Sequence, residues 1–380
     1  MLKHALLFLA ILSAPLANAQ PFAIGTRSIT FTDASRSRDI PCTVHYPALT
    51  GGNATPAADG TFPVLVHGHG FVMTVDAYTN LRDGFVPKGY ILVLPTTEGG
   101  FAPAHASFGQ DLSFLADALQ AAGADLSSPL FGHVAPATAL MGHSMGGGAS
   151  FLGAANNANI QALVNFAPAE TNPSAIAAAA DVQVPTLVFA ATEDCVTPTA
   201  ANQRPMYDAV PVACKAFVEI IGGGHCFFGA SSFTCSLGEV TCGPDLTISR
   251  EQQHDVMNDF AGLWLDHFLK DDQGAINTFR DSVLVSTRVN SEQTCITTAV
   301  PASGSLLGSR LWPVPADAFL RSEGAPANVA VEVHDAAGKC VLRRAFVGQT
   351  LDISELPNGT YRVSWSEGEA LVTMPFVVLR

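Results

Sequence analysis

The stretch MGHSMGGGAS, residues 141–150, decides the fold of this 380-residue chain. It holds a complete G-x-S-x-G pattern around Ser144 and directly follows the apolar run 139–141. Small and apolar residues continue beyond it, so the pattern predicts a strand, a sharp turn and a helix. Only glycine lets strand and helix approach as closely as this turn requires. We therefore interpret Ser144 as a nucleophile raised above a sheet edge, and not as an idle serine in a glycine-rich turn.

A serine hydroxyl needs a histidine base, and a carboxylate must hold the tautomer of that histidine. In this kind of fold the chain order is serine, acid, histidine. His225 closes a Gly-Gly-Gly-His loop after the apolar run 216–221 and is the predicted base. Asp194, just past the run 186–190, is the predicted acid, with Glu193 as its rival. Weaker candidates are Glu170 and Asp208 for the acid, and His254, His267 and His334 for the base.

The negative oxygen that forms during acyl transfer needs two backbone N–H donors. The N–H of Met145 stands at the start of the predicted helix and is the first candidate. The second donor is expected in the loop after the apolar run 62–66, and Phe71 in His67-Gly68-His69-Gly70-Phe71 is the candidate. The two histidines of this loop could also suggest a metal, but no carboxylate cluster accompanies them. We expect no metal or cofactor, and expect His67 to pack and hydrogen-bond within the loop.

Short apolar runs alternate with helical patterns between residues 60 and 270. Such alternation predicts an α/β fold with a mostly parallel sheet covered by helices on both faces. The predicted strands are 62–66, 90–94, 139–141, 186–190 and 216–221, and the predicted helices are 111–119 and 252–269. After residue 300 the pattern changes to short alternating strands and Gly-containing turns, which indicates a small all-β, sandwich-like domain.

These patterns divide the chain. A basic start, the apolar run Leu6–Leu12 and Ala17-Asn18-Ala19 predict a cleaved signal peptide over residues 1–19. A catalytic domain is expected over 20–300, a linker over 301–310 and the β domain over 311–380. The signal segment is too short to span a bilayer, and no other stretch approaches about 20 apolar residues, so no transmembrane segment is expected.

Charge and cysteine content narrow the classes of partner and compartment. The net charge is −14 without a basic run, which disfavours nucleic acid and anionic membranes as partners. Export to an oxidising compartment favours disulfides among the eight cysteines. We expect Cys195 to pair with Cys214, at most one pair among Cys226, Cys235 and Cys242, and no zinc site. Sequence alone leaves the connectivity open.

With these residues in place, the chain resembles the α/β-hydrolases, and more narrowly the bacterial cutinases and polyester hydrolases. Dienelactone hydrolases and chlorophyllases are wider relatives. The resemblance covers about 60–280 and rests on four stretches: Gly142–Gly148, Val184–Leu187 leading to Asp194 and Pro198, Gly222–His225, and Phe268–Asp272. It implies Ser144 as nucleophile, His225 as base, Asp194 as its orienting acid, and the Phe71 and Met145 amides as oxyanion hole.

The resemblance also implies substrate contacts at Phe71, His143 and Ala169. Polyester-degrading relatives usually have tryptophan where Ala169 stands, so half of an aromatic clamp on the acyl group is missing. Phe227 and Phe228 are candidates for replacement aromatics. We therefore expect a secreted serine ester hydrolase, with a small-ester esterase lacking polymer activity as the alternative. A peptidase or thioesterase, or a non-catalytic surface binding protein, is less favoured.

The tail, about 305–380, resembles a type IX secretion sorting domain. The resemblance rests on Leu311-Trp312-Pro313-Val314-Pro315-Ala316, Asp335–Lys339, Leu351-Asp352-Ile353 and Asn358-Gly359-Thr360-Tyr361. The usual motif has asparagine where Val314 stands, and an immunoglobulin-like binding module is the alternative. The resemblance implies type IX machinery as a partner and a secreted or cell-surface protein, which we expect to be monomeric.

Overall fold

The computed structural model describes residues 21–155, 157–240, 242, 246–295, 310–312, 316, 318–323, 328–335, 339–367, 370–378 and 380. The predicted signal peptide lies outside these residues, as does the predicted linker except for Arg310. Val314 and the tail turn at 336–338 also lie outside them.

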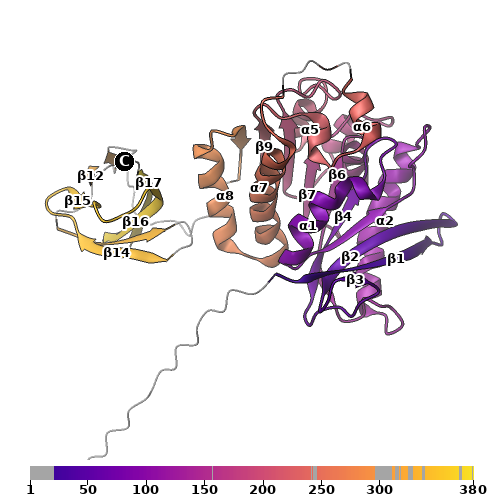
Figure 1. Cartoon of the computed structure of the whole chain (residues 1–380), viewed down its shortest axis with the longest axis horizontal. Coiled ribbons are helices and arrows are strands. Elements are labelled where there is room, and N and C mark those ends of the chain that lie inside the picture. The colour runs from indigo at the N-terminus through magenta and orange to yellow at the C-terminus, as the bar shows by residue number, and fades with distance from the viewer. Residues whose placement is uncertain are drawn as a thin grey trace, which may run out of the picture.

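A ten-stranded sheet forms the centre of the larger domain, in the order β10-β9-β8-β7-β6-β4-β5-β2-β1-β3 (Figure 1). The six strands from β9 to β5 are parallel to one another. Three pairs are antiparallel: β10 with β9, β2 with β5, and β1 with β2. The strands are β1 Ala23–Asp33, β2 Arg38–Ala48, β3 Gly52–Asn53, β4 Phe62–Gly68, β5 Ile91–Pro95, β6 Val134–His143, β7 Ala162–Phe166, β8 Thr186–Ala191, β9 Lys215–Ile220 and β10 Val289–Gln293.

Helices cover both faces of this sheet because its central strands are apolar on both sides. Leu65 of β4 packs in one core cluster, and its neighbours Val64 and Val66 pack in the other, as the two-residue period of a strand requires. The helices are α1 Thr79–Phe85, α2 His105–Ala124, α3 Met145–Ala154, α4 Ala175–Ala179, α5 Gln203–Ala209, α6 Phe233–Gly238, α7 Arg250–Lys270 and α8 Gln273–Val285, with 3-10 turns η1 Val75–Tyr78, η2 Val86–Lys88 and η3 His225–Phe228. Helices α1, α7 and α8 contribute to the first cluster, and α2 to α5 to the second.

The predicted α/β fold with helices on both faces is confirmed. All five predicted strands are present, with shifted ends, and the two predicted helices are the cores of α2 and α7. The sequence patterns did not predict β7 or the antiparallel extension of the sheet through β2 and β1. In β7 the polar Asn165 interrupts a five-residue strand, and β1 lies near the sheet edge with only two buried residues.

The tail folds into two small antiparallel sheets with a core of their own. One has the order β11-β12-β15 and the other β14-β13-β16-β17. The strands are β11 Arg310–Trp312, β12 Phe319–Glu323, β13 Ala330–Asp335, β14 Cys340–Ala345, β15 Thr350–Asp352, β16 Gly359–Glu367 and β17 Ala370–Val378. The predicted all-β character of the tail is confirmed.

Three disulfides join loops of the larger domain: Cys195–Cys242, Cys214–Cys295 and Cys226–Cys235. The expected Cys195–Cys214 pair is therefore wrong. Cys214 lies at the start of β9 and reaches the segment just past the antiparallel partner β10 instead. At most one internal pair was expected among Cys226, Cys235 and Cys242, and the structure has one, Cys226–Cys235.

Within the part of the chain that the structure describes, no helix is long and apolar enough to cross a membrane.

Candidate active site

Ser144 occupies the sharp turn between β6 and α3. Its φ of +54° and ψ of −122° are strained for a residue with a side chain, and 8% of its surface is exposed. Two flanking glycines are required by contact. A Cβ on Gly142 would lie 2.2 Å from the Gly146 carbonyl oxygen, and one on Gly146 would lie 2.1 Å from the Gly68 carbonyl oxygen. The backbone here has the geometry of a nucleophile elbow.

A buried acid–base pair lies at the ends of two neighbouring strands. Asp194 follows β8 and His225 follows β9, and their Oδ2 and Nδ1 atoms are 2.8 Å apart. Both side chains are almost completely buried. Because Nδ1–H donates to the carboxylate, Nε2 is left with a lone pair and can accept a proton.

The Asp194 carboxylate accepts three further hydrogen bonds from its own loop. Oδ1 accepts from the backbone N–H groups of Val196 and Thr197, at 2.9 and 2.8 Å. Oδ2 accepts from the Thr197 hydroxyl at 2.8 Å. The buried Gln203 amide donates to the same hydroxyl at 3.0 Å and to the Pro168 carbonyl at 2.8 Å. These bonds fix the orientation of the carboxylate.

The loop that carries His225 is fixed by side chains of α7 and by Glu239, the residue just past α6. The Gln253 amide accepts from the Gly224 N–H and donates to the Gly224 carbonyl, both at 3.0 Å. Glu239 accepts from the Cys226 N–H at 2.8 Å. The Arg250 guanidinium donates to the Cys226 carbonyl, and to the Gly229 carbonyl at 2.7 Å. Residues that act through another side chain belong to no local sequence motif. The sequence therefore did not point to Thr197, Gln203, Gln253 or Arg250.

His143, directly before Ser144, connects the elbow to both neighbouring loops. Its Nε2 lies 3.1 Å from the His225 carbonyl and must carry the proton, because a carbonyl can only accept. Its Nδ1 then accepts from the Tyr78 hydroxyl at 3.1 Å, and that hydroxyl accepts from the Gly70 N–H at 2.7 Å. Burial lowers the pKa of His143 well below its usual range. This histidine is therefore neutral.

The two candidate oxyanion donors are the backbone amides of Phe71 and Met145. Met145 is the first residue of α3, and Phe71 follows β4, the strand next to β6. Among the described residues, neither amide donates to a carbonyl or a side chain. Both are thus available to a negatively charged oxygen.

The remaining sequence candidates lie in other settings. No direct hydrogen bond joins the hydroxyl of Ser144 to His225 in the structure, but His143, the residue before Ser144, contacts His225 through its ring and its Nε2–H. The rival acid Glu193 accepts from Thr192, and His254 and His267 bond backbone carbonyls outside the pair. His67 is fully buried, and neither of its ring nitrogens has a partner in the described chain. The expected hydrogen bond of His67 is therefore wrong.

Residues expected to contact substrate differ in their exposure. Half of the Phe71 surface is exposed, and Ala169 is partly exposed. His143 is fully buried and bonded at both nitrogens, which leaves it no surface for a substrate. Phe228 is also fully buried, and the Phe227 ring lies under the Arg250 guanidinium at 4.4 Å. Phe228 therefore does not replace the aromatic residue missing at 169, and the face of Phe227 is already covered.

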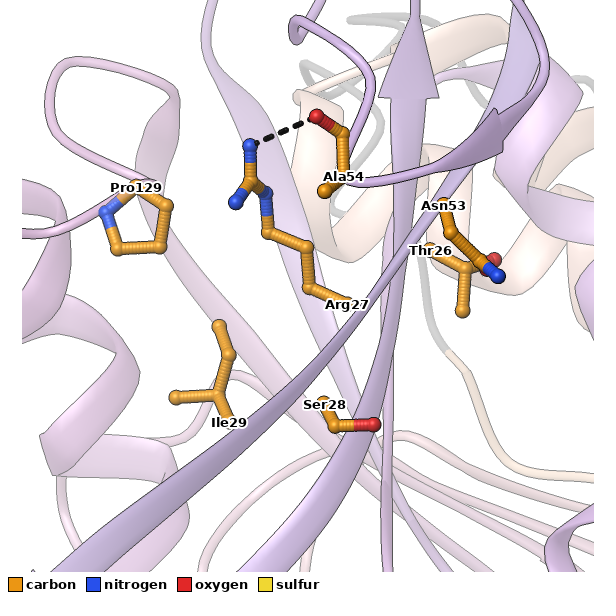
Figure 2. A pocket seen from close by; sticks show the side chains of 7 residues that line it. All are labelled: Thr26, Arg27, Ser28, Ile29, Asn53, Ala54 and Pro129. Atoms are coloured by element: carbon orange, nitrogen blue, oxygen red, sulfur yellow. Dashed lines mark hydrogen bonds between the residues drawn. The ribbon is translucent and has the colours of Figure 1, made fainter.

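A pocket of about 380 Å³ lies away from this site, at the β1–β3 edge of the sheet. Figure 2 shows its lining, in which the Arg27 side chain reaches toward the Ala54 carbonyl. That guanidinium also donates through Nε to the Tyr46 hydroxyl. The pocket is four or more strands from β6, β8 and β9, and we assign it no part in the chemistry.

Glu332, His334 and Cys340 of the tail place their ligand-type atoms within 4.8 Å of one another, the one such group among the described residues. The Arg343 guanidinium donates to Glu332 at 2.9 Å and already supplies the positive charge there.

The model of the PET hydrolase-like family matches residues 13–242, more than half of the chain. The chain belongs to this family. Over 88 residues it is 34% identical to Cutinase 2 of Thermobifida cellulosilytica and to Cutinase cut1 of Thermobifida fusca. These matches cover 23% of this chain and 32% and 26% of those cutinases.

A longer match is 26% identical over 185 residues to a bis(hydroxyethyl) terephthalate hydrolase of Streptomyces coelicolor. It covers 48% of this chain and 54% of that protein. The matched segments thus span about a quarter to a half of the curated relatives. Separately, residues 310–379 match the model of a secretion system C-terminal sorting domain. The tail is therefore a sorting domain, and the chain is exported by type IX secretion.

Proposed function

We propose that this chain hydrolyses carboxylic esters by acyl transfer to Ser144. The observation that carries the proposal is the buried Asp194–His225 pair beside a strained serine elbow. Membership of the PET hydrolase-like family supports the same bond type.

The proposed reaction has two halves. Ser144 Oγ attacks the ester carbonyl carbon while His225 Nε2 takes the hydroxyl proton, and the oxygen that becomes negative is held by the Phe71 and Met145 amides. The tetrahedral intermediate expels the alcohol, which receives the proton from His225. In the second half His225 deprotonates a water that attacks the acyl-serine. The carboxylic acid leaves and Ser144 regains its proton.

Asp194 acts in this scheme through His225. Its charge holds the Nδ1–H tautomer and stabilises the imidazolium that forms in each half. The bonds from Val196 and Thr197 keep that charge in place. We assign His143 a positioning role, because its neutral ring joins the elbow to the His225 loop.

The test of this chemistry compares the full chain with Ser144→Ala on a soluble short-chain ester. We expect the substitution to lower kcat by at least about 10³-fold, and a serine-directed phosphonate to label only the unaltered chain. Hydrolysis surviving in Ser144→Ala would contradict the assignment of the nucleophile.

Ala169 favours a second candidate, a small-ester esterase without polymer activity. Its methyl group offers little surface opposite Phe71 for holding an aromatic acyl group. Acid release from an amorphous aromatic polyester, with Ser144→Ala as the blank, separates the candidates. Release above the blank supports a polyester hydrolase. Activity on the short-chain ester alone supports the small-ester enzyme.

A further inference from the structure

Phe101 lies exposed on the same edge of the sheet as the candidate site. It follows β5, Phe71 follows β4, and Ser144 follows β6, and these three strands are parallel neighbours in the order β6-β4-β5. The carboxyl ends of parallel neighbours meet at one edge of a sheet. With about 4.8 Å between strands, the ends of β5 and β6 are roughly 10 Å apart.

The two phenylalanine rings contact each other edge to face. Their centroids are 6.4 Å apart and their planes meet at 76°, an arrangement that aromatic pairs prefer. The exposed fractions are 86% for Phe101 and 50% for Phe71. A single exposed phenylalanine carries little information. Here the exposed ring extends the aromatic surface that begins at a candidate oxyanion residue.

The loop that presents Phe101 is held at its base. The Glu98 carboxylate accepts from the Ala104 N–H at 2.6 Å, where α2 begins, and pairs with Arg38 at 2.7 Å. Arg38 in turn bonds the buried Asp111 of α2. The base is also joined to the oxyanion loop, because His69 Nε2 lies 2.9 Å from the Thr97 carbonyl. Holding both loops in register reduces the ordering cost of binding between them.

Among the residues expected to contact substrate, those that follow β7 and β9, on the other side of β6, offer no comparable exposed ring. Ala169 presents a methyl group, Phe228 is buried, and the Phe227 ring is covered by Arg250. The aromatic pair of Phe71 and Phe101 therefore lies on the β4–β5 side of the site. A flat apolar group extending from the reacting ester would meet Phe71 first and Phe101 next.

We propose that Phe101 is a specificity-determining residue that binds a second aromatic ring of the substrate, one ring beyond Phe71. The proposal rests on the ester-hydrolase function above and names its substrate class, ester-linked chains with more than one aromatic ring. A one-ring ester that reacts at Ser144 places its ring beside Phe71 and has no second ring for Phe101. A two-ring ester supplies that second ring, so the benefit of Phe101 should depend on substrate length.

The test measures kcat/KM of the full chain on bis(2-hydroxyethyl) terephthalate and on its two-ring dimer. We expect Phe101→Ala to lower the dimer-to-monomer ratio of kcat/KM about tenfold, chiefly through KM, which corresponds to about 1.4 kcal/mol. Phe101→Trp should keep the ratio of the unaltered chain. Phe101→Leu should lower it, because leucine keeps apolar area but loses the ring.

Phe131→Ala is the matched control. Phe131 is 44% exposed and precedes β6, at the amino edge of the parallel strands. The dimer-to-monomer ratio of kcat/KM in Phe131→Ala should therefore equal that of the unaltered chain. An unchanged ratio in Phe101→Ala would overturn the proposal. If Phe101→Leu keeps the dimer-to-monomer ratio of the unaltered chain, the claim that Phe101 acts through an aromatic contact is wrong. If the unaltered chain hydrolyses neither these esters nor a short aliphatic one, the ester-hydrolase proposal itself fails.

Discussion

At the scale of single residues, Asp194 shows how a short loop prepares a charge. Both carboxylate oxygens are used, and each partner is a donor within three residues of Asp194 or the histidine itself. Thr197 contributes twice, through its N–H and its hydroxyl. Its hydroxyl is itself held by Gln203. Thr197 is therefore a positioning residue for the proposed acid.

Thr197→Val should lower kcat about tenfold on a short-chain ester, because one hydrogen bond to a buried charge is lost. KM should change little, since Thr197 is buried behind His225 and away from substrate. Steady-state kinetics give both values. Thr197→Ser keeps the hydroxyl and should restore kcat. If kcat falls as much in Thr197→Ser as in Thr197→Val, the effect comes from packing and not from the hydroxyl.

His67 is a second informative residue, because it is buried without a partner. Burial lowers its pKa to about 3. Between that value and about 6.5, the unfolded chain binds a proton at this histidine and the folded chain does not. The free energy of unfolding is thus unaffected above about pH 6.5 and falls as the pH decreases below it.

His67→Leu should make the protein less sensitive to acid. We expect the difference in unfolding free energy between pH 7 and pH 5 to shrink by about 2 kcal/mol relative to the unaltered chain. Urea unfolding at the two pH values measures it. His133→Gln, at a half-buried loop histidine, is the control and should leave the difference unchanged. An unchanged difference in His67→Leu would mean that His67 is protonated in the folded chain.

At the scale of elements, α6 is attached to the site by two covalent links. Cys226 follows His225 and bonds Cys235 of α6, while Cys195 follows Asp194 and bonds Cys242 just beyond α6. The chain around α6 thus connects the loops of the proposed acid and base. Their relative position depends on this segment as well as on β8 and β9.

Replacing Cys195 and Cys242 together by serine should destabilise the protein. Chain-entropy arguments give about 4 kcal/mol for a loop of 47 residues. We expect a lower unfolding temperature in calorimetry, and a loss of ester hydrolysis well below that temperature as the Asp194 loop loosens. Cys340→Ser, at a free cysteine of the tail, is the control. Full activity up to the unfolding temperature would show that the Cys195–Cys242 link is not needed to hold the site.

At the scale of the whole molecule, the two lobes have separate cores. The two clusters of the larger domain draw on residues between Phe22 and Cys295, and the tail cluster draws on residues from Leu311 onward. Arg362 of β16 pairs with Asp281 of α8, a half-exposed contact worth little energy. We propose that 20–300 is an independent, monomeric catalytic domain, with a linker over 301–310 and the sorting domain over 311–380.

Ending the chain at residue 300 should leave kcat/KM on a short-chain ester within about twofold of the full chain. Cys295 and its disulfide are retained in this shortened chain, so the β9–β10 edge stays closed. Kinetics combined with light scattering test both the domain boundary and the monomer. An inactive or aggregated product would place tail contacts among those that stabilise the larger domain.

The sequence by itself determined the parts of this protein that depend on local order. Apolar runs ending in glycine specify strands and the Ser144 elbow, because only glycine tolerates carbonyl contacts such as those at Gly142 and Gly146. It also placed Asp194 and His225 after neighbouring strands, where the structure joins them at 2.8 Å. The strands of the tail could be predicted because they too depend on a local pattern in the sequence.

Only the tertiary structure decided what depends on contacts between distant segments. It paired Cys195 with Cys242, buried His143 and Phe228, and left His67 without a partner. It also brought Phe101 against Phe71, 30 positions apart in sequence, through the adjacency of β4 and β5. A sequence pattern specifies which way a side chain faces along its own strand or helix. What that side chain touches is set by the packing of the whole sheet.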